Sequence, residues 1–275
     1  MLVLRFEPLP VFSEDQNLER GATQATFPLP YGRVHLWHVN LDAPVATVLD
    51  LAKSLSDDER ERAVQFRFTR DRRRFVVGRG FLRHLISNYI ACEPANMCFE
   101  YGPFGKPSLV RADLDSISFN LSHSESLAVF ALARGLELGV DVERVDCTID
   151  VERLAGQFFA EGEIADINAW PPYQRYARFF ELWTRKEALI KAQGKGLTAL
   201  REFDVSICRS TPVNSLESPG NSAAGWAVRQ FIPGPGYVAA LAVSGSACHA
   251  TSWDVRWSQS PSCGYVSSQQ ADLFA

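Results

Sequence analysis

The sequence lacks the features that mark several common protein classes. Its six cysteines are scattered without a Cys-x-x-Cys pair, which argues against a zinc cluster or a disulfide framework. No run of about 18 apolar residues predicts a membrane span. Residues 1–7 are interrupted by charge and lack the apolar core of a signal peptide. These absences predict a cytoplasmic protein that has no membrane partner.

Positive charge is also in deficit over the whole chain. The formal net charge of −4 argues against general binding of nucleic acid. Basic residues nevertheless gather between Arg60 and Arg83, so a local phosphate site remains compatible with the overall charge. The 275 residues, 46% of them apolar and 22% charged, are typical of a globular protein with a substantial core.

Two acidic motifs predict a binding site for a divalent cation. In a Gly-Val-Asp-Val-Glu run, Asp141 and Glu143 alternate with valines, and a strand would put both carboxylates on one face. Residues 183–191 predict a helix in which Glu187 and Lys191 lie one turn apart. Three carboxylates beside a lysine suit Mg²⁺ holding a phosphate ester, because Mg²⁺ takes oxygen ligands and completes its shell with water and substrate phosphate.

Each motif alone is more typical of surface charge, but further motifs accompany them in a fixed order. They are Phe-Gly-Lys-Pro at 104–107, Phe-Asn-Leu-Ser-His-Ser at 119–124 and Phe-Phe-Ala at 158–160, preceded by Leu55-Ser56 with Glu59 and Arg62, by Arg72-Arg73-Arg74 and by Leu82-Arg83. Over residues 32–245 this order and spacing resemble the Sfp-type 4′-phosphopantetheinyl transferases.

The resemblance implies an activity, a cofactor and partners. Members of that family transfer the phosphopantetheine arm of coenzyme A to a serine of an acyl or peptidyl carrier protein. They release adenosine 3′,5′-bisphosphate and require Mg²⁺. It also implies an α+β fold of two similar halves related by pseudo-twofold symmetry, each a small sheet packed with helices, with coenzyme A between them. Such a protein would function as a monomer.

Matching positions to the family's motifs assigns expected roles to individual residues. The metal ligands would be Asp141, Glu143 and Glu187, and the catalytic residues would be Glu187, Lys191 and His123. Lysine acts as a movable point charge, which suits Lys191 beside the pyrophosphate. His123 can donate a hydrogen bond to phosphate.

The resemblance places further residues against coenzyme A. Arg74 would bind the 3′-phosphate through its planar fork, which matches phosphate oxygens. Lys106 and Pro107 would border the adenosine, and Ser122, with His123 and Lys191, would contact the phosphates. Glu59 stands where relatives can have a lysine, and Glu125 stands where a glycine is common.

The proton acceptor for the attacking serine stays open at this stage. Glu187, Glu163 and a water bound to the metal are the three candidates. Two other functions also remain as alternatives: a non-catalytic module that binds coenzyme A or a carrier protein, and a metal-dependent phosphodiesterase. The second predicts histidines among the ligands, and the chain has only five.

The periodicity of the sequence predicts the order of elements and domains. An extension (1–30) precedes a first half (31–125), a second half carrying the metal site (126–250) and a partly disordered tail (251–275). We expect helices at 70–90, 151–159 and 173–193, the last ended by Gly194 and Gly196. Strands are expected at 34–39, 97–101, 117–121, 202–207, 226–232 and 237–243, with a mobile loop at 211–224. The apolar run 127–133 should pair with 138–145 through a turn at Gly135.

Overall fold

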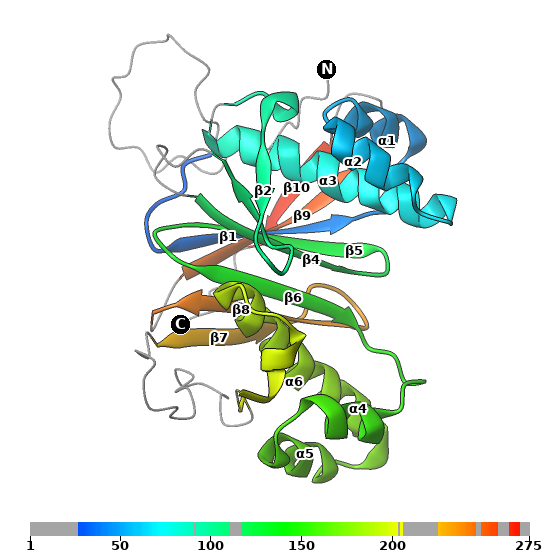
Figure 1. Ribbon diagram of the computed structural model, residues 1–275, viewed down its shortest axis with the longest axis vertical. Coiled ribbons are helices and arrows are strands. Elements are labelled where there is room, and N and C mark those ends of the chain that lie inside the picture. Colours follow the sequence, from blue (N-terminus) through cyan, green and yellow to red (C-terminus); the bar gives the residue numbers. More distant parts are fainter. Residues whose placement is uncertain are drawn as a thin grey trace. The chain divides into compact units, whose positions relative to one another are not determined.

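The computed structural model describes residues 27–90, 92–110, 117–202, 204–205, 225–245 and 249–257, and the backbone of 264–269 (Figure 1). Most of the predicted extension and the whole predicted loop at 211–224 lie outside these residues. The chain forms two compact units. The smaller unit contains Val39–Cys98 and Trp253–Gln269, and the larger contains Pro30–His38 and Phe99–Ser252. Both combine helices with strands, which confirms the α+β class; the symmetry and the division at residue 125 stay predictions.

The smaller unit is built on three helices: α1 (Val45–Ala52), α2 (Asp57–Val64) and α3 (Thr69–Ile90). Helix α2 begins after Ser56, whose N–H donates to the Glu59 carboxylate (3.2 Å) in a capping box. The inward face of α3 carries Leu82, Leu85 and Ile86, which are fully buried. A 3₁₀ turn (Pro94–Asn96) follows. Helix α1 was not predicted, because its eight residues give too short a periodic signal.

The ends of two strands and a third strand complete the smaller unit. Strand β1 (Arg33–Asn40) ends in it, as does β9 (His249–Trp257), and β10 (Gly264–Gln269) lies next to β9. The indole N–H of Trp257 donates to the Asn40 carbonyl (2.5 Å). Strand β9 was not predicted, because the mixed polarity of residues 249–257 hides its alternation.

The larger unit contains two stacked sheets and a hairpin. In one sheet β1 lies next to β5 (Leu127–Arg134), which pairs with β4 (Ile117–Ser124). In the other sheet β8 (Tyr237–Ser244) lies between β6 (Leu138–Arg144) and β7 (Trp226–Phe231). The hairpin pairs β2 (Phe99–Tyr101) with β3 (Pro107–Leu109). Alternate residues of β6 and β8 meet β1 and β5 in an apolar layer: Leu138, Val140, Val142, Ala239, Leu241 and Val243.

The predicted pairing of 127–133 with 138–145 is wrong. Strand β5 has β1 and β4 on its two edges, and β6 pairs instead with β8, with Asp141 opposite Ala240. The chain turns at Gly135, whose φ of +69° lies in the left-handed region, and enters the second sheet. A strand buried on both faces carries no alternation that identifies its partner.

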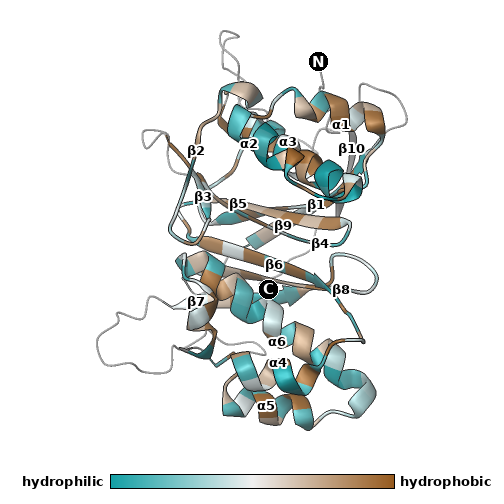
Figure 2. Cartoon of the chain, turned by 45° about the vertical axis from the view of Figure 1, so that its right-hand side comes forward, coloured by the Kyte–Doolittle hydropathy of each residue, from teal (hydrophilic) through white to brown (hydrophobic). Residues whose placement is uncertain are grey.

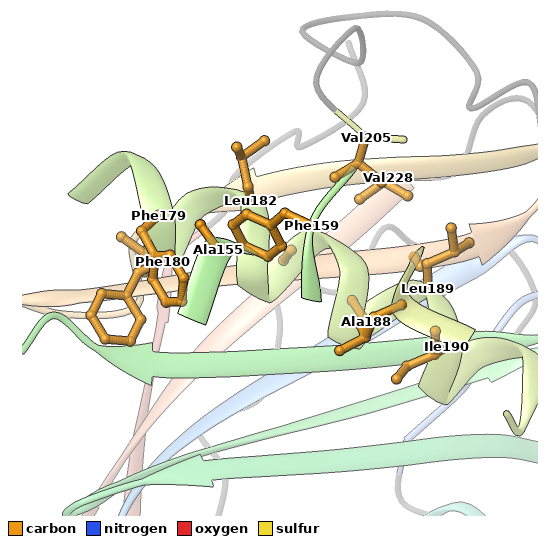
Figure 3. Close-up of a cluster of buried hydrophobic side chains, with 14 of the residues drawn as sticks. Ala155, Phe159, Phe179, Phe180, Leu182, Ala188, Leu189, Ile190, Val205 and Val228 are labelled. Carbon is orange, nitrogen blue, oxygen red and sulfur yellow. The ribbon is translucent and has the colours of Figure 1, made fainter. Parts of the chain in front are cut away.

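Three helices of the larger unit follow β6: α4 (Val151–Phe158), α5 (Glu161–Asn168) and α6 (Pro172–Gln193). Helix α6 runs along β6 and β8 on the face opposite β5 (Figure 1). Its apolar side chains join those of α4 and of β8 in a second core (Figure 3), which includes Phe159, Phe179, Leu182, Leu189 and Ala240. The helix ends at Gly194, with a φ of +65°, as predicted.

Two further details differ from expectation. Helix α5 was not predicted. Of the strand expected at 202–207, residue 202 ends a 3₁₀ turn (Leu197–Glu202) and residues 204–205 are not in a strand, while residues 203, 206 and 207 lie outside the described residues. The hydropathy of the elements differs: the residues of strand β6 are mostly hydrophobic, and those of helix α2 are mostly hydrophilic (Figure 2). No helix in the described part of the chain is both long and apolar enough to span a membrane.

Gly139 allows β6 and α6 to touch through their backbones. A Cβ atom at this position would lie 2.2 Å from the Ala188 carbonyl oxygen and 2.3 Å from the Ala192 nitrogen. Backbone atoms held in a helix cannot move aside as a flexible side chain can. No residue other than glycine therefore fits between this strand and this helix.

We expect Gly139→Ala to lower the free energy of unfolding by about 3 kcal/mol, because the added methyl group overpacks a rigid contact. Gly156→Ala is the matched control. Its Cβ would meet nothing within 4 Å, so it should stabilise α4 by about 0.5–1 kcal/mol. Urea unfolding of both variants measures the difference. Equal stability of the two variants would show that the backbone contact is looser than described.

Candidate functional site

Strand β6 presents its acidic residues to helix α6. Val140 and Val142 face the layer shared with β1 and β5, so Gly139, Asp141 and Glu143 occupy the opposite face. The predicted common face of the two carboxylates is therefore confirmed, and it is the face that α6 covers. Helix α6 contributes Glu187 and Lys191 from its last two turns. The two motifs noticed in the sequence meet in one place because Gly139 lets their backbones touch.

Lys191 binds the innermost carboxylate. Its Nζ lies 2.6 Å from Asp141 Oδ1 and 3.0 Å from Ser122 Oγ on β4. The Ser122 hydroxyl donates to the same carboxylate oxygen at 2.8 Å. Asp141 is 2% exposed, and its other oxygen, Oδ2, has no hydrogen-bond partner among the described residues. A buried carboxylate oxygen without a partner is a costly arrangement unless a cation or a ligand completes it.

Strand β4 holds the free edge of β6 through alternate side chains. Asn120 Oδ1 accepts from the Val140 N–H (2.9 Å), and Ser124 Oγ accepts from the Arg144 N–H (3.1 Å) and donates to Glu143 Oε2 (2.7 Å). The sequence interpretation missed Asn120 and Ser124. Their alternation with apolar residues in 117–124 was the available signal, since it shows that polar side chains share one face.

Negative charge exceeds positive charge in this cluster. Burial, then the charge of Asp141, raises the pKa of Glu187 to about 7. Burial also raises the pKa of Glu143, and it raises that of Asp141 even though the Lys191 ammonium opposes it. The carboxylates thus lie close enough to disfavour one another's ionisation. One lysine faces three acids, so a second cation would be stabilised here.

The donor set fits a hard divalent ion. In the described part of the chain, no three His, Cys, Asp or Glu side chains are already arranged as a metal-holding group. Lys191 occupies Asp141 Oδ1, and Ser124 occupies one oxygen of Glu143, while Asp141 Oδ2 has no partner within the described ranges. Oxygen ligands supplied by carboxylates match Mg²⁺ or Mn²⁺ better than they match Zn²⁺.

Ser122 and His123 lie on opposite faces of β4, as neighbouring residues of a strand must. Ser122 is buried among the acids, whereas His123 is exposed. The structure therefore brings Ser122, but not the side chain of His123, to the face that meets Asp141. At the turn after them, Glu125 has a φ of +51°, in the region that favours glycine.

Lys106 connects the β2–β3 hairpin to the two elements that carry the acids. Its Nζ donates to the Leu138 carbonyl (3.1 Å) at the start of β6 and to the Ala192 carbonyl (3.0 Å) near the end of α6. Burial lowers the pKa of this ammonium. Pro107 follows it as the first residue of β3. Lys106 thus holds the acid-bearing elements together through at least two of its three donors.

In the smaller unit, Arg74 binds the carboxylate of Asp42. Its Nε and Nη2 donate to the two oxygens of Asp42, at 2.8 and 2.9 Å, and this bond lowers the pKa of Asp42. A fork that binds one carboxylate in this way also matches a phosphate. Glu59 has a different role from the family lysine: it is 2% exposed and accepts from Arg83 Nε (2.7 Å). It is therefore a structural residue.

Glu163 is removed from the candidates for the proton acceptor. It is 0% exposed, and its oxygens accept from Lys186 Nζ (2.6 Å), the Ala160 N–H (2.8 Å) and the Val205 N–H (2.9 Å). Lys186 is equally buried and lies over the Phe159 ring. A carboxylate so enclosed cannot reach a substrate. The pair instead ties α5 and the segment at Val205 to α6.

The sequence matches known families over most of its length. Residues 137–242 match the 4′-phosphopantetheinyl transferase superfamily, and residues 43–134 match the N-terminal part of a 4′-phosphopantetheinyl transferase family. The 4′-phosphopantetheinyl transferase HetI of Nostoc sp. is 38% identical over 221 residues, which are 80% of this chain and 91% of that protein. A putative 4′-phosphopantetheinyl transferase of Synechocystis sp. is 35% identical over 52% of this chain and 58% of its own. The Sfp transferase of Bacillus subtilis is 29% identical over 68% and 81%.

We expect Lys186→Met to lower the free energy of unfolding by about 3–5 kcal/mol, because it leaves Glu163 buried without its cation. The double variant Glu163→Gln/Lys186→Met should recover most of that loss, since neither side chain is then charged. Denaturant titrations of the single and double variants test this. A double variant as unstable as Lys186→Met would mean that shape, and not charge, makes the pair necessary.

Proposed function

The chain belongs to the 4′-phosphopantetheinyl transferase superfamily and is a transferase of that type, and we propose that it moves the arm from coenzyme A to a serine of an apo acyl or peptidyl carrier protein with the help of Mg²⁺. Membership confirms the resemblance that the motifs indicated. The observation that carries the detailed proposal is the cluster of Asp141, Glu143 and Glu187 beside Lys191, with more buried acid than one lysine can neutralise.

The reaction requires charge neutralisation and positioning. The serine oxygen forms a bond to the β-phosphorus, the bond from that phosphorus to the bridging oxygen breaks, and adenosine 3′,5′-bisphosphate departs. The serine proton passes to a base. Such displacements depend chiefly on orientation and on groups that stabilise negative charge. A Mg²⁺ ion held by Asp141, Glu143 and Glu187 would neutralise the diphosphate.

Residues of the chain itself supply the other requirements. The Lys191 ammonium, 2.6 Å from Asp141, carries a positive charge that can stabilise the leaving oxygen. Ser122 binds both Asp141 and Lys191, so it orients them towards each other. His123 and Pro107 are further proposed contacts of coenzyme A, at its phosphates and at its adenosine. Lys106 would border the adenosine and, at the same time, hold β6 against α6.

Arg74 is the proposed contact of the 3′-phosphate. Its bidentate bond to Asp42, which is half exposed, supports the proposal, because a phosphate can replace a solvent-accessible carboxylate at the same fork. With Arg74 already oriented by Asp42, little side-chain entropy remains to be lost on binding.

The variant Asp141→Asn should reduce turnover by at least about 100-fold, since the amide cannot neutralise a cation and such ligands contribute several kcal/mol. The assay follows the mass of an apo carrier incubated with coenzyme A, Mg²⁺ and enzyme. Glu161→Gln, at an exposed acid of α5, is the control and should keep wild-type turnover. Full activity of Asp141→Asn would remove this residue from the metal shell. Retained binding of coenzyme A without any carrier loading by the wild type would favour the non-catalytic module.

Arg74→Ala should raise the KM for coenzyme A by about tenfold or more, because it removes charge-assisted hydrogen bonds. The KM for dephospho-coenzyme A, which lacks the 3′-phosphate, should change far less. Asp42→Asn is the matched control, since it removes the competing carboxylate and should not raise either KM. Equal losses with both donors would refute the assigned contact.

A further inference from the structure

Two of the three acids in the candidate site have a serine of β4 as a hydrogen-bond donor. The Ser122 hydroxyl donates to Asp141 Oδ1 (2.8 Å), and the Ser124 hydroxyl donates to Glu143 Oε2 (2.7 Å). Each serine precedes its acid by 19 residues, so β4 and β6 run in the same direction here and their alternate side chains meet in pairs. Glu187, on α6, accepts no hydrogen bond from the described residues. The two strand acids are therefore fixed by β4, and the helix acid is not.

The direction of the Ser124 hydrogen bond is set by a backbone group. The Arg144 N–H donates to Ser124 Oγ at 3.1 Å. A serine hydroxyl has a single proton, and an Oγ that already accepts from an N–H points this proton at a different acceptor. That acceptor is Glu143 Oε2, and two hydrogen bonds in series strengthen each other. Ser124 thus holds one oxygen of Glu143 in a fixed direction.

Glu143 needs such a restraint more than Asp141 does. A glutamate side chain has one more rotatable bond than an aspartate, and Glu143 is only partly buried, whereas Asp141 is 2% exposed. Because Ser124 binds Oε2, the other oxygen, Oε1, is left for a ligand, and it accepts no hydrogen bond from the described part of the chain. Carboxylates that bind metal ions are commonly held in this way by a hydrogen-bond partner of their own.

We propose that Ser124 is a positioning residue, which orients Glu143 so that one oxygen of this carboxylate binds a divalent cation with little further loss of side-chain freedom. The Arg144 backbone N–H orients the serine in turn. This inference rests on the proposed function, which places a hard cation such as Mg²⁺ at the acids. It extends that proposal from the acids to a residue that does not contact the cation but aims one of its ligands.

A purely structural role is the competing interpretation, and Asn120 shows what such a role requires. Asn120 Oδ1 accepts from the Val140 N–H (2.9 Å), so it supports β6 through a backbone atom alone. Support of this kind needs only an acceptor. Ser124 accepts from the Arg144 N–H in the same way, but it also directs its only proton at an acid. The second bond is unnecessary for holding the strand and is explained by the orientation of Glu143.

The variants Ser124→Ala and Ser124→Thr test the proposal in the full-length protein, with coenzyme A bound and no carrier present. Mn²⁺ is the probe, because the electron paramagnetic resonance signal of the free ion measures binding without turnover. Ser124→Ala should weaken Mn²⁺ binding about 10-fold or more, the usual effect of removing the hydrogen-bond partner of a metal ligand. Ser124→Thr keeps the hydroxyl, so its Mn²⁺ affinity should stay within about threefold of wild type.

The dependence of carrier loading on Mg²⁺ gives a second readout. In Ser124→Ala, the Mg²⁺ concentration for half-maximal turnover should rise about 10-fold. Saturating Mg²⁺ should restore most of kcat, because Glu143 is still present and has only lost its fixed orientation. The KM for coenzyme A, measured at saturating Mg²⁺, should stay within about twofold of wild type, since a residue that acts through Glu143 changes the binding of the cation and not that of the nucleotide.

Two control variants separate the orientation of Glu143 from general effects. Ser126→Ala removes a hydroxyl two residues further along, which lies 3.5 Å from the Tyr237 hydroxyl, and it should bind Mn²⁺ as the wild type does. Asn120→Ala removes a contact to a backbone group only. It should lower the melting temperature, with a smaller loss of Mn²⁺ affinity than Ser124→Ala shows. If the loss of affinity follows the melting temperature across these variants, Ser124 is a structural residue and the proposal is overturned.

The outcomes distinguish this inference from the proposed function. If the wild type binds Mn²⁺ but loads no carrier, the proposed transfer fails, while weaker Mn²⁺ binding by Ser124→Ala still supports the positioning role. If Asp141→Asn and Glu143→Gln leave Mn²⁺ binding unchanged, the cation does not occupy the acids, and both proposals about it are overturned. Wild-type Mn²⁺ affinity in Ser124→Ala, or equal losses in Ser124→Ala and Ser124→Thr, would overturn this inference alone.

Discussion

The direct contact between the backbones of β6 and α6 is the constraint on which the site depends. Gly139 permits it, because a Cβ atom there would lie 2.2 Å from a helix carbonyl oxygen. Two residues further along the strand, Asp141 meets Lys191, and Glu187 lies one turn before Lys191 on the helix. An ordinary helix-on-sheet spacing, set by side chains, would separate these groups. Lys106 secures the same contact from outside by donating to both elements.

Helix α6 contributes the lysines of two lysine–carboxylate pairs that illustrate opposite uses of a buried charge. Lys186 and Glu163 are fully buried, and backbone N–H groups complete the shell of Glu163. Every charge there is compensated, so the pair is a structural connection. Lys191 instead faces three acids, and one oxygen of Asp141 has no partner among the described residues. Incomplete compensation marks the second pair as a place for ligands.

The sequence predicted elements better than it predicted pairings. The strand-like run 138–145 was recognised, but its partner was misassigned. It pairs with β8 and packs against β5, and the sequences of these two strands are similarly apolar. Helices α3 and α6, each 22 residues long, were found because periodicity accumulates over several turns. Helices α1 and α5, with eight residues each, were missed because two turns give only a weak periodic signal, although α4, which is equally short, was recognised. Glu59 stands where relatives can have a lysine, and only its burial beside Arg83 revealed its structural role.

The sequence by itself determined the family, the identity of the acids and their placement on a strand and on a helix. These properties follow from residue order and local periodicity, which each segment carries alone. Only the tertiary structure decided that β6 leaves the sheet of β5, that Ser122 and Ser124 bind the acids, and that Glu163 is enclosed. Such facts depend on which distant segments exclude water from one another, and hydrophobic burial is non-directional, so local pattern cannot specify its partners.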